Sequence, residues 1–246
     1  MELNPSKCSN MRVTRPDTPF IHNYILRGHI LESLNEIKYL GVTISSNLEW
    51  KKHIANITSK ANTTLGMLRR NLRNVPQAIK EKAYIALVRP KVEYAPTVWD
   101  PHTARDINEV EKVQRRAARF VCHSYHNTSS VNDMLDNIGW PSLQHRRTVQ
   151  RLCMLYKIHY RLVDIPIPNY IQPAQVITRY MNPLSYTKIL STRDYFAYQF
   201  FPRTIFQWNC LPAQIVSIPT IEAFRSSISP LNFTTPPFIY NVYTDK

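Results

Sequence analysis

Residues 103–122, TARDINEVEKVQRRAARFVC, do most to decide the fold, because their pattern is that of a helix with two different faces. Apolar residues recur at three- and four-residue intervals, which predicts one buried stripe made of Ile107, Val110, Val113, Ala117 and Val121. Thr103 precedes the helix as a candidate N-cap. Cations at offsets of three, four and seven share the opposite face, namely Lys112, Arg115, Arg116 and Arg119. The sequence therefore predicts a helix anchored on one side with a row of positive charges on the other.

Helical periodicity also extends over much of the remaining chain. Residues 49–72 place one apolar stripe on a long helix, which Ser46 or Asn47 can cap, made of Ile54, Ile57, Ala61, Leu65, Leu68 and Leu72. Further helices are predicted at 77–88 after Pro76, at 130–137 before Gly139, at 141–162, near 203–210 and at 219–228. These patterns indicate a fold that is mainly helical.

Strands are predicted only near the N-terminus. Residues 8–15, 23–27 and 37–44 contain alternating or β-branched segments, and Gly28 is suited to close a hairpin. We expect a three-stranded antiparallel sheet over residues 8–45, which would be marginal by itself. Residues 164–202 are expected to form extended segments and turns, and 230–246 a tail without assigned structure. The predicted fold class is α+β, mainly α.

The charge balance favours a polyanionic partner. Lys and Arg number 31 against 17 Asp and Glu, a formal net charge of +14, and the pI is about 9.8. Such an excess typically serves attraction to nucleic acid or to an anionic surface. The chain has no apolar run long enough for a membrane span and no signal-peptide pattern, so we expect the nucleus or cytoplasm and no membrane partner. The four scattered cysteines are expected to be reduced.

Basic residues cluster on more than one predicted helix. Besides the row at 112–119, they occur at Lys51 and Lys52, at Arg69, Arg70 and Arg73, and at Arg146, Arg147 and Arg151. A single charge run is usually a solvated face, but repetition on several helices favours contact with phosphates. An anionic membrane surface is the weaker alternative, because no basic face is paired with the exposed aromatic residues of a membrane anchor.

Catalytic and metal-binding patterns are not found. Cys122, His123 and His126 are close in sequence but lack the second ligand pair of a zinc site. Asp133 and Asp136 share a helical face without a third carboxylate, whereas two-metal phosphoryl transfer needs a carboxylate cluster. With only four glycines, phosphate-binding loops are also not expected. We therefore expect no active site, no cofactor, no metal and no small-molecule substrate.

Several segments together resemble a known family. They are LNPSKC (3–8), IKYLGVTISSNLEWKKHI (37–54), ALVRPKVEYAPTVWDPHT (86–103), EKVQRRAARFV (111–121) and FPRTIFQWNCLP (201–212). In order and spacing they resemble the C-terminal part of reverse transcriptases of non-LTR, jockey-like (LINE-type) retrotransposons: the end of the palm, the thumb and the region that follows. The resemblance covers about residues 3–228.

The resemblance implies a division of the chain and of its roles. Residues 1–47 would be a remnant of the palm with a primer-grip-like hairpin, 48–126 a thumb-like helical bundle, 127–229 a helical and irregular C-terminal region, and 230–246 a tail. The primer-grip-like residues would be Tyr39, Leu40, Gly41 and Val42. In this family the catalytic aspartate pair precedes the LNPSKC segment, so no catalytic residue is assigned here, and Mg²⁺ would belong only to the intact polymerase.

Together these observations predict a non-catalytic reverse transcriptase fragment that contacts RNA or an RNA–DNA duplex through phosphates. Its other partner would be the missing palm and fingers. Two alternatives remain open: polymerase activity that requires a separately supplied palm, and a basic protein-interaction module. Primer extension tests the first alternative, and affinity for a hybrid duplex compared with an acidic peptide tests the second.

Overall fold

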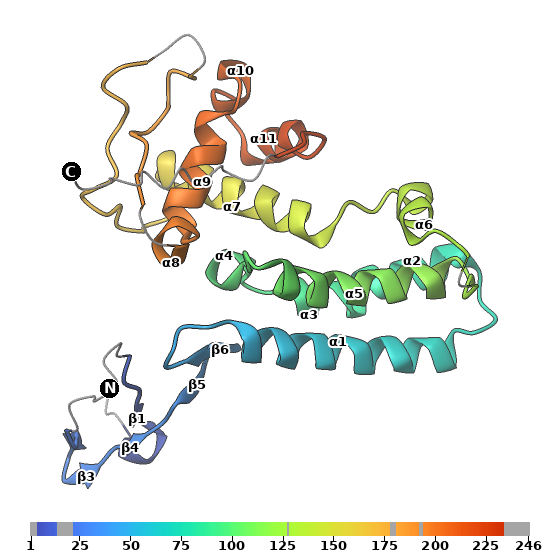
Figure 1. Ribbon diagram of the computed structural model, residues 1–246, viewed down its shortest axis with the longest axis horizontal. Helices are drawn as coiled ribbons and strands as arrows, with labels where there is room; N and C mark the ends of the chain where they lie inside the picture. The colour runs from blue at the N-terminus through green and yellow to red at the C-terminus, as the bar shows by residue number, and fades with distance from the viewer. Residues whose placement is uncertain (1–3, 14–21, 127, 178–180, 192–193, 234–246) are drawn as a thin grey trace, which may run out of the picture. The chain divides into compact units, whose positions relative to one another are not determined.

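The computed structural model describes residues 4–13, 22–126, 128–177, 181–191 and 194–233 (Figure 1). The chain divides into two compact units. The first consists of residues 1–92 and 103–123, and the second of residues 93–102 and 124–246. The described elements are mostly helices, with small sheets confined to the N-terminal part of the first unit. The predicted α+β, mainly α class is confirmed. The fourfold division into domains rests on the family resemblance and stays a prediction.

The N-terminal strands form three two-stranded sheets. β1 (Ser9–Asn10) pairs in parallel with β4 (Glu32–Ser33), while β2 (Ile25–Leu26) pairs antiparallel with β3 (His29–Ile30). β5 (Glu36–Tyr39) pairs antiparallel with β6 (Val42–Ser45), and a 3₁₀ turn, Pro5–Lys7, precedes them all. The prediction of one three-stranded antiparallel sheet is wrong.

Two tight turns explain this difference. Arg27 and Gly28 have φ of 49° and 80°, and Leu40 and Gly41 have φ of 46° and 88°. Positive φ at both central residues is the conformation of a two-residue hairpin turn, so the chain reverses there. The predicted role of Gly28 is confirmed, whereas the segment 37–44 is a hairpin and not one strand.

The first unit is held together by three helices. α1 (Lys51–Asn71) packs against α2 (Gln77–Leu87) and α5 (Ala104–Val121), and α2 also packs against α5. α3 (Arg89–Glu93) ends where the second unit begins. The predicted stripe on α1 is buried from Ile54 to Leu68, as are Val110, Val113, Ala117 and Val121 on α5. In Figure 1, α1 and α5 run alongside each other in the same direction.

The helix ends differ in how they are capped. Thr103 caps α5 as predicted, since its Oγ1 accepts a hydrogen bond from the Asp106 N–H at 3.3 Å. The predicted cap at Ser46 or Asn47 is wrong, because α1 begins after Trp50, which makes no side-chain cap. Asn47 instead accepts a hydrogen bond from the Glu49 N–H within the preceding turn, where Leu48 has a φ of 57°.

The second unit is built around α7 (Leu143–His159), which packs against α4 (Pro96–Trp99), α9 (Phe200–Asn209) and α11 (Ile221–Ile228). α6 (Val131–Ile138), α8 (Asp194–Ala197) and α10 (Ala213–Val216) complete its described helices. The core contains Leu152, Leu155, Tyr156, Ile205, Trp208 and Phe224. Most of the predicted helices are present, whereas α3, α4, α8 and α10 were not predicted. The expectation that residues 164–202 are only extended segments and turns is wrong at its end, where α8 and the start of α9 are helical.

The irregular part of the second unit follows α7. Its described residues between 164 and 191 form turns and extended segments, with one bridge between Pro173 and Tyr186. Asn182 fastens this region to α9, because its Nδ2 donates to the carbonyl oxygens of Trp208 (2.9 Å) and Leu211 (3.2 Å). Most of the predicted tail, residues 234–246, lies outside the described residues. None of the described helices is both long enough and apolar enough to cross a bilayer.

Candidate nucleic-acid interface and a buried arginine cluster

The predicted basic row lies on the outward side of α5. Lys112 and Arg116 are exposed, and Arg115 and Arg119 are half-buried. On the other side of the same helix, Val110, Val113 and Ala117 are fully buried against the first unit. The helix is therefore anchored by its apolar face, which fixes the direction in which its cations project.

Three cations of this row, Lys112, Arg115 and Arg116, form contacts at the protein surface. Lys112 Nζ lies 2.6 Å from Glu109 Oε1, and Arg116 Nη1 donates to Asn62 Oδ1 on α1 at 3.0 Å. Arg115 Nη2 donates at 3.4 Å to the side chain and the carbonyl of Asn108. Surface contacts of this kind contribute at most about 1 kcal/mol each. Because a guanidinium carries five N–H donors, Arg115 and Arg116 retain donors for a phosphate.

The pKa of Glu109 is lowered by the positive charges around it on this helix. The hydrogen bond from Lys112 lowers the pKa of Glu109, and the nearby charges of Arg116 and Arg105 lower it further. On α5 as a whole, five cations stand beside three carboxylates, namely Asp106, Glu109 and Glu111, which leaves a net charge of +2. The local charge remains positive, as a polyanion-binding surface requires.

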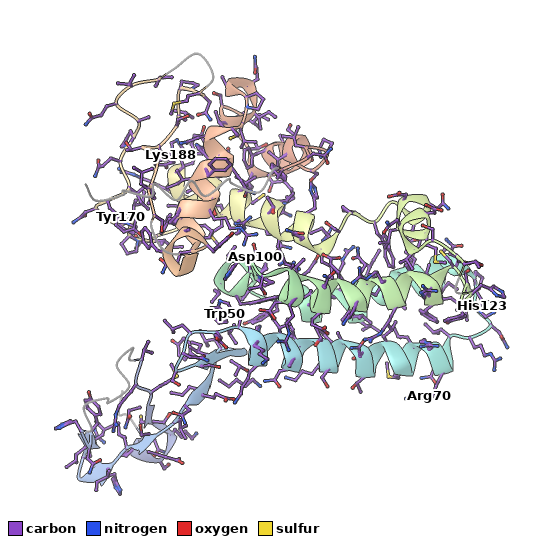
Figure 2. The ribbon with its side chains drawn as sticks, viewed as in Figure 1. Trp50, Arg70, Asp100, His123, Tyr170 and Lys188 are labelled. Carbon is purple, nitrogen blue, oxygen red and sulfur yellow. The ribbon has the colours of Figure 1, made fainter. Side chains whose placement is uncertain are left out.

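The second predicted basic group lies along α1. Lys51, Lys52, Arg69, Arg70 and Arg73 are all exposed. Lys52 forms an ion pair with Glu36 of β5, so it also joins α1 to the hairpin. Figure 2 labels Arg70 and His123 at the same end of the α1–α5 pair. The two helices that carry these basic residues, α1 and α5, pack against each other in the first unit.

The third predicted basic group, on α7, is not a surface row. Arg147 and Arg151 have side chains that are 0% and 1% exposed, and the half-buried Arg146 forms a two-pronged ion pair with Glu93. The expectation that Arg147 and Arg151 contact a nucleic-acid backbone from a helix surface is therefore wrong. Spacing on a helix indicates which residues share a face, but not whether another segment covers that face.

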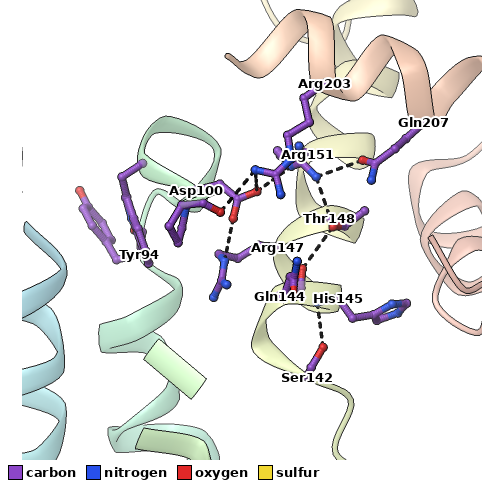
Figure 3. A network of polar contacts seen from close by, with 12 residues as sticks. Tyr94, Asp100, Ser142, Gln144, His145, Arg147, Thr148, Arg151, Arg203 and Gln207 are labelled. Atoms are coloured by element: carbon purple, nitrogen blue, oxygen red, sulfur yellow. Dashed lines mark hydrogen bonds and ion pairs between the residues drawn. The ribbon is translucent and has the colours of Figure 1, made fainter. Parts of the chain in front are cut away.

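The arginine-bearing face of α7 is covered by the segment that contains Asp100, the residue directly after α4. Its Oδ1 accepts a hydrogen bond from Arg147 Nε at 2.8 Å (Figure 3). Its Oδ2 lies 2.9 Å from Arg151 Nε and 3.2 Å from Arg203 Nη1, without hydrogen-bond alignment in either contact. The Asp100 side chain is 5% exposed and that of Arg203 is 4% exposed. We call Asp100, Arg147, Arg151 and Arg203 the arginine cluster.

Neighbouring groups satisfy part of the arginine cluster. Arg151 Nη2 donates to Gln207 Oε1 at 3.0 Å and to Thr148 Oγ1 at 3.2 Å, and the Arg147 guanidinium lies 5.9 Å from the Trp99 ring centroid. Burial lowers the pKa of Arg151 to about 9, because desolvation and the charges of Arg203 and Arg147 outweigh the attraction of Asp100. The energetic problem of this site is an excess of buried positive charge.

Two members of this cluster were missed in the sequence. Neither Asp100 nor Arg203 was assigned a role from the sequence. Both lie inside the segments that carry the family resemblance, TVWDP and FPRTIFQWNCLP. A charged residue inside a strongly apolar segment was the available signal, since such residues are seldom buried without a partner.

The primer-grip-like residues form the turn between β5 and β6. Tyr39 and Leu40 are 63% and 74% exposed, whereas Val42 is buried. The hairpin is attached to α1 by His53, whose Nδ1 accepts a hydrogen bond from the Thr43 N–H at 3.1 Å. Burial, and to a smaller extent the charge of Lys60, lowers the pKa of His53. The neutral imidazole is therefore the form that holds the hairpin.

The other titratable groups of the described segments do not form a metal site or a reactive thiol. Across the described residues, no three His, Cys, Asp or Glu side chains are grouped so that they could hold a metal ion. Burial raises the pKa of the Cys122, Cys153 and Cys210 thiols, which disfavours the reactive thiolate. Asp133 and Asp136 are exposed on α6.

Comparison with known proteins relates part of this chain to polymerases. No family model matches it, and no solved structure matches it significantly. It is 26% identical over 128 residues to a probable RNA-directed DNA polymerase from transposon BS of Drosophila melanogaster, and 25% identical over 128 residues to the RNA-directed DNA polymerase from mobile element jockey of Drosophila funebris. Each match covers 49% of this chain.

The chain spans only 14% and 13% of the length of these two relatives. An uncharacterized protein of Caenorhabditis elegans is 26% identical over 135 residues, which are 53% of this chain and 68% of that protein. About half of this chain is therefore distantly related to RNA-directed DNA polymerases of transposons.

Proposed function

We propose that this chain is a non-catalytic part of a retrotransposon reverse transcriptase that follows the catalytic palm and contacts template–primer nucleic acid through phosphates. Residues 48–126 would act as the thumb, with α1 and α5 facing an RNA or RNA–DNA duplex. The observation that carries the proposal is the α5 row of Lys112, Arg115, Arg116 and Arg119 on a helix anchored by its opposite face. The similarity to transposon polymerases supports the choice of partner.

The row is suited to a phosphate backbone and not to base reading. Its first and last cations, Lys112 and Arg119, are seven positions apart, which is about 10 Å of helix at 1.5 Å per residue. Cations bind phosphates without regard to sequence, whereas sequence is read at base edges in a groove. We therefore expect little sequence discrimination and strong dependence on salt.

The test replaces Lys112, Arg115, Arg116 and Arg119 together by Gln and measures affinity for an RNA–DNA hybrid at several salt concentrations. Each lost phosphate contact reduces the slope of log K against log salt by about 0.9, so the slope should fall by about 3 to 4. A matched control replaces four cations of the second unit, Lys157, Arg161, Lys188 and Arg225. Both variants lose four charges, and the control should keep the slope.

An equal loss of slope in the two variants would show that only net charge attracts the duplex. An unchanged slope in the α5 variant would show that this row is a solvated surface. Primer extension with the purified chain and Mg²⁺ tests the non-catalytic assignment, and any extension without added palm would contradict it. Stronger binding to an acidic peptide than to the duplex would favour a protein-interaction module.

We further propose that the N-terminal hairpins contact the rest of the polymerase. Ile25, Ile30, Tyr39 and Leu40 are 63 to 74% exposed on strands and turns of only a few residues. Short strands with exposed apolar side chains are not stable units by themselves. Co-expression with the palm and fingers should protect the amides of residues 25–42 from hydrogen exchange.

A further inference from the structure

The arginine cluster of the second unit is not electrically balanced. Three guanidinium groups surround one carboxylate, which leaves an excess of two positive charges among side chains that are 0 to 5% exposed. Buried charges are normally compensated by an opposite charge, because the desolvation cost of an isolated ion is several kcal/mol. Within the described part of the chain, Asp100 is the carboxylate recorded in ion pairs with these arginines.

The unsatisfied donors of the cluster point to the same deficit. Five guanidinium nitrogens are buried without a hydrogen-bond partner anywhere in the described chain: Arg147 Nη1 and Nη2, Arg151 Nε and Nη1, and Arg203 Nε. They come from two helices, α7 and α9, and from side chains that meet at one carboxylate (Figure 3). A water molecule could accept some of these hydrogen bonds, but it would not offset the charge.

We propose that the arginine cluster binds a small phosphate-type oxyanion inside the second unit. Such an anion supplies negative charge and several acceptor oxygens at once, and guanidinium groups match its geometry with paired N–H donors. The donors are enclosed, so a small free anion suits the site better than the end of a polymer. The proposal is independent of the α5 row, whose residues belong to the first unit.

Arg147 provides the most informative variant. Both of its terminal nitrogens lack partners, and only its Nε contacts Asp100. Arg147→Met removes one charge while filling a similar volume, and Arg151 and Arg203 remain beside Asp100. The control is Arg161→Met, which removes an exposed arginine of the same unit.

The experiment measures the melting temperature of the full chain in increasing inorganic phosphate, with chloride at equal ionic strength as reference. Wild type and Arg161→Met should show a saturable rise, on the order of 5 °C when phosphate is 100 times its Kd. Arg147→Met should lose this rise. Equilibrium dialysis of wild type against radiolabelled phosphate should give one phosphate per chain, and this measurement does not depend on any variant folding.

Other results would overturn the proposal. The proposal fails if phosphate raises the melting temperature no more than chloride does. It also fails if phosphate raises the melting temperature of Arg147→Met as much as that of wild type. In either case the cluster would be a purely internal network. Dialysis without stoichiometric binding would do the same. A 5′-phosphorylated oligonucleotide that stabilises the chain where free phosphate does not would exclude an enclosed small anion.

Discussion

Replacing Asp100 by Asn should destabilise the second unit strongly. The substitution keeps the shape of the side chain but removes the carboxylate recorded in ion pairs with Arg147, Arg151 and Arg203. The cluster would then hold three buried positive charges without an ion-pair partner. Removal of one partner from a buried ion pair typically costs about 3 to 5 kcal/mol.

The contacts of Asp100 give a similar magnitude. One contact, from Arg147 Nε at 2.8 Å, is an aligned hydrogen bond to a charged group, a class that contributes about 1.5 to 3 kcal/mol. The contacts with Arg151 and Arg203 at 2.9 and 3.2 Å add Coulomb attraction without hydrogen-bond alignment. We therefore expect a loss of about 4 kcal/mol, a large part of the stability of a typical domain.

Urea unfolding in phosphate-free buffer, followed by tryptophan fluorescence, measures this loss. Trp99, Trp140 and Trp208 belong to the second unit, so the signal comes mainly from the unit under test. With an m-value of about 2 kcal/mol/M, the midpoint should fall by on the order of 2 M. The exposed Asp164→Asn is the matched control and should change stability by less than about 0.5 kcal/mol.

Because the cluster is buried, the destabilisation should persist at high salt, unlike that of a surface pair. The reasoning is refuted if Asp100→Asn unfolds within about 0.5 kcal/mol of wild type. The three arginines would then be accommodated without their carboxylate.

Two further predictions concern the first unit. The pKa of His53 is lower in the folded chain than its value of about 6.5 in the unfolded chain. Below about pH 6.5 the unfolded chain therefore binds more protons than the folded chain. The free energy of unfolding should be highest above that pH and should decrease as the pH falls toward the folded-state pKa. Hydrogen exchange of the Thr43 amide should accelerate over the same pH range, because this amide donates to His53. His53→Asn retains an acceptor but does not titrate, so it should flatten the dependence of stability on pH. A steep pH dependence in this variant would contradict the role given to His53. Thr103→Ala removes the α5 cap and should lower the free energy of unfolding in urea by about 1 kcal/mol. Thr103→Ser keeps a capping hydroxyl and should restore most of this loss. Equal stability of the wild type and both variants would show that the cap contributes nothing.

Much of the helical structure follows from sequence because its signals are local. The apolar stripes of α1 and α5 and the caps at Thr103, Ser130 and Ser142 depend on residues within a few positions of each other. The N-terminal sheets were predicted less well, because strand pairing joins segments distant in sequence. The turn at Gly28 had a local signal, whereas the hairpin at Tyr39–Val42 was expected only from the family resemblance.

The two arginine rows show why the candidate site was only partly predictable. On α5 and on α7 the sequence offers the same pattern, basic residues three and four positions apart. On α5 the side facing away from the cations carries the small and β-branched residues that pack against α1 and α2, so the cations remain at the surface. On α7, apolar residues such as Val149, Leu152 and Leu155 surround the row, which indicates a helix buried on most sides.

A helix buried on most sides has to place any arginine it carries next to an acceptor. For α7 that acceptor comes from Asp100, 47 residues earlier in the chain. Intervals between arginines therefore do not distinguish a phosphate-binding face from an internal ion-pair network. The distinction depends on how apolar the rest of the helix is, and this criterion separates α5, with its exposed Lys112 and Arg116, from α7, with its buried Arg147 and Arg151. Applied to α1, whose outward side carries Lys52, Ser59, Thr63 and Arg70, it assigns the α1 cations to the surface together with those of α5.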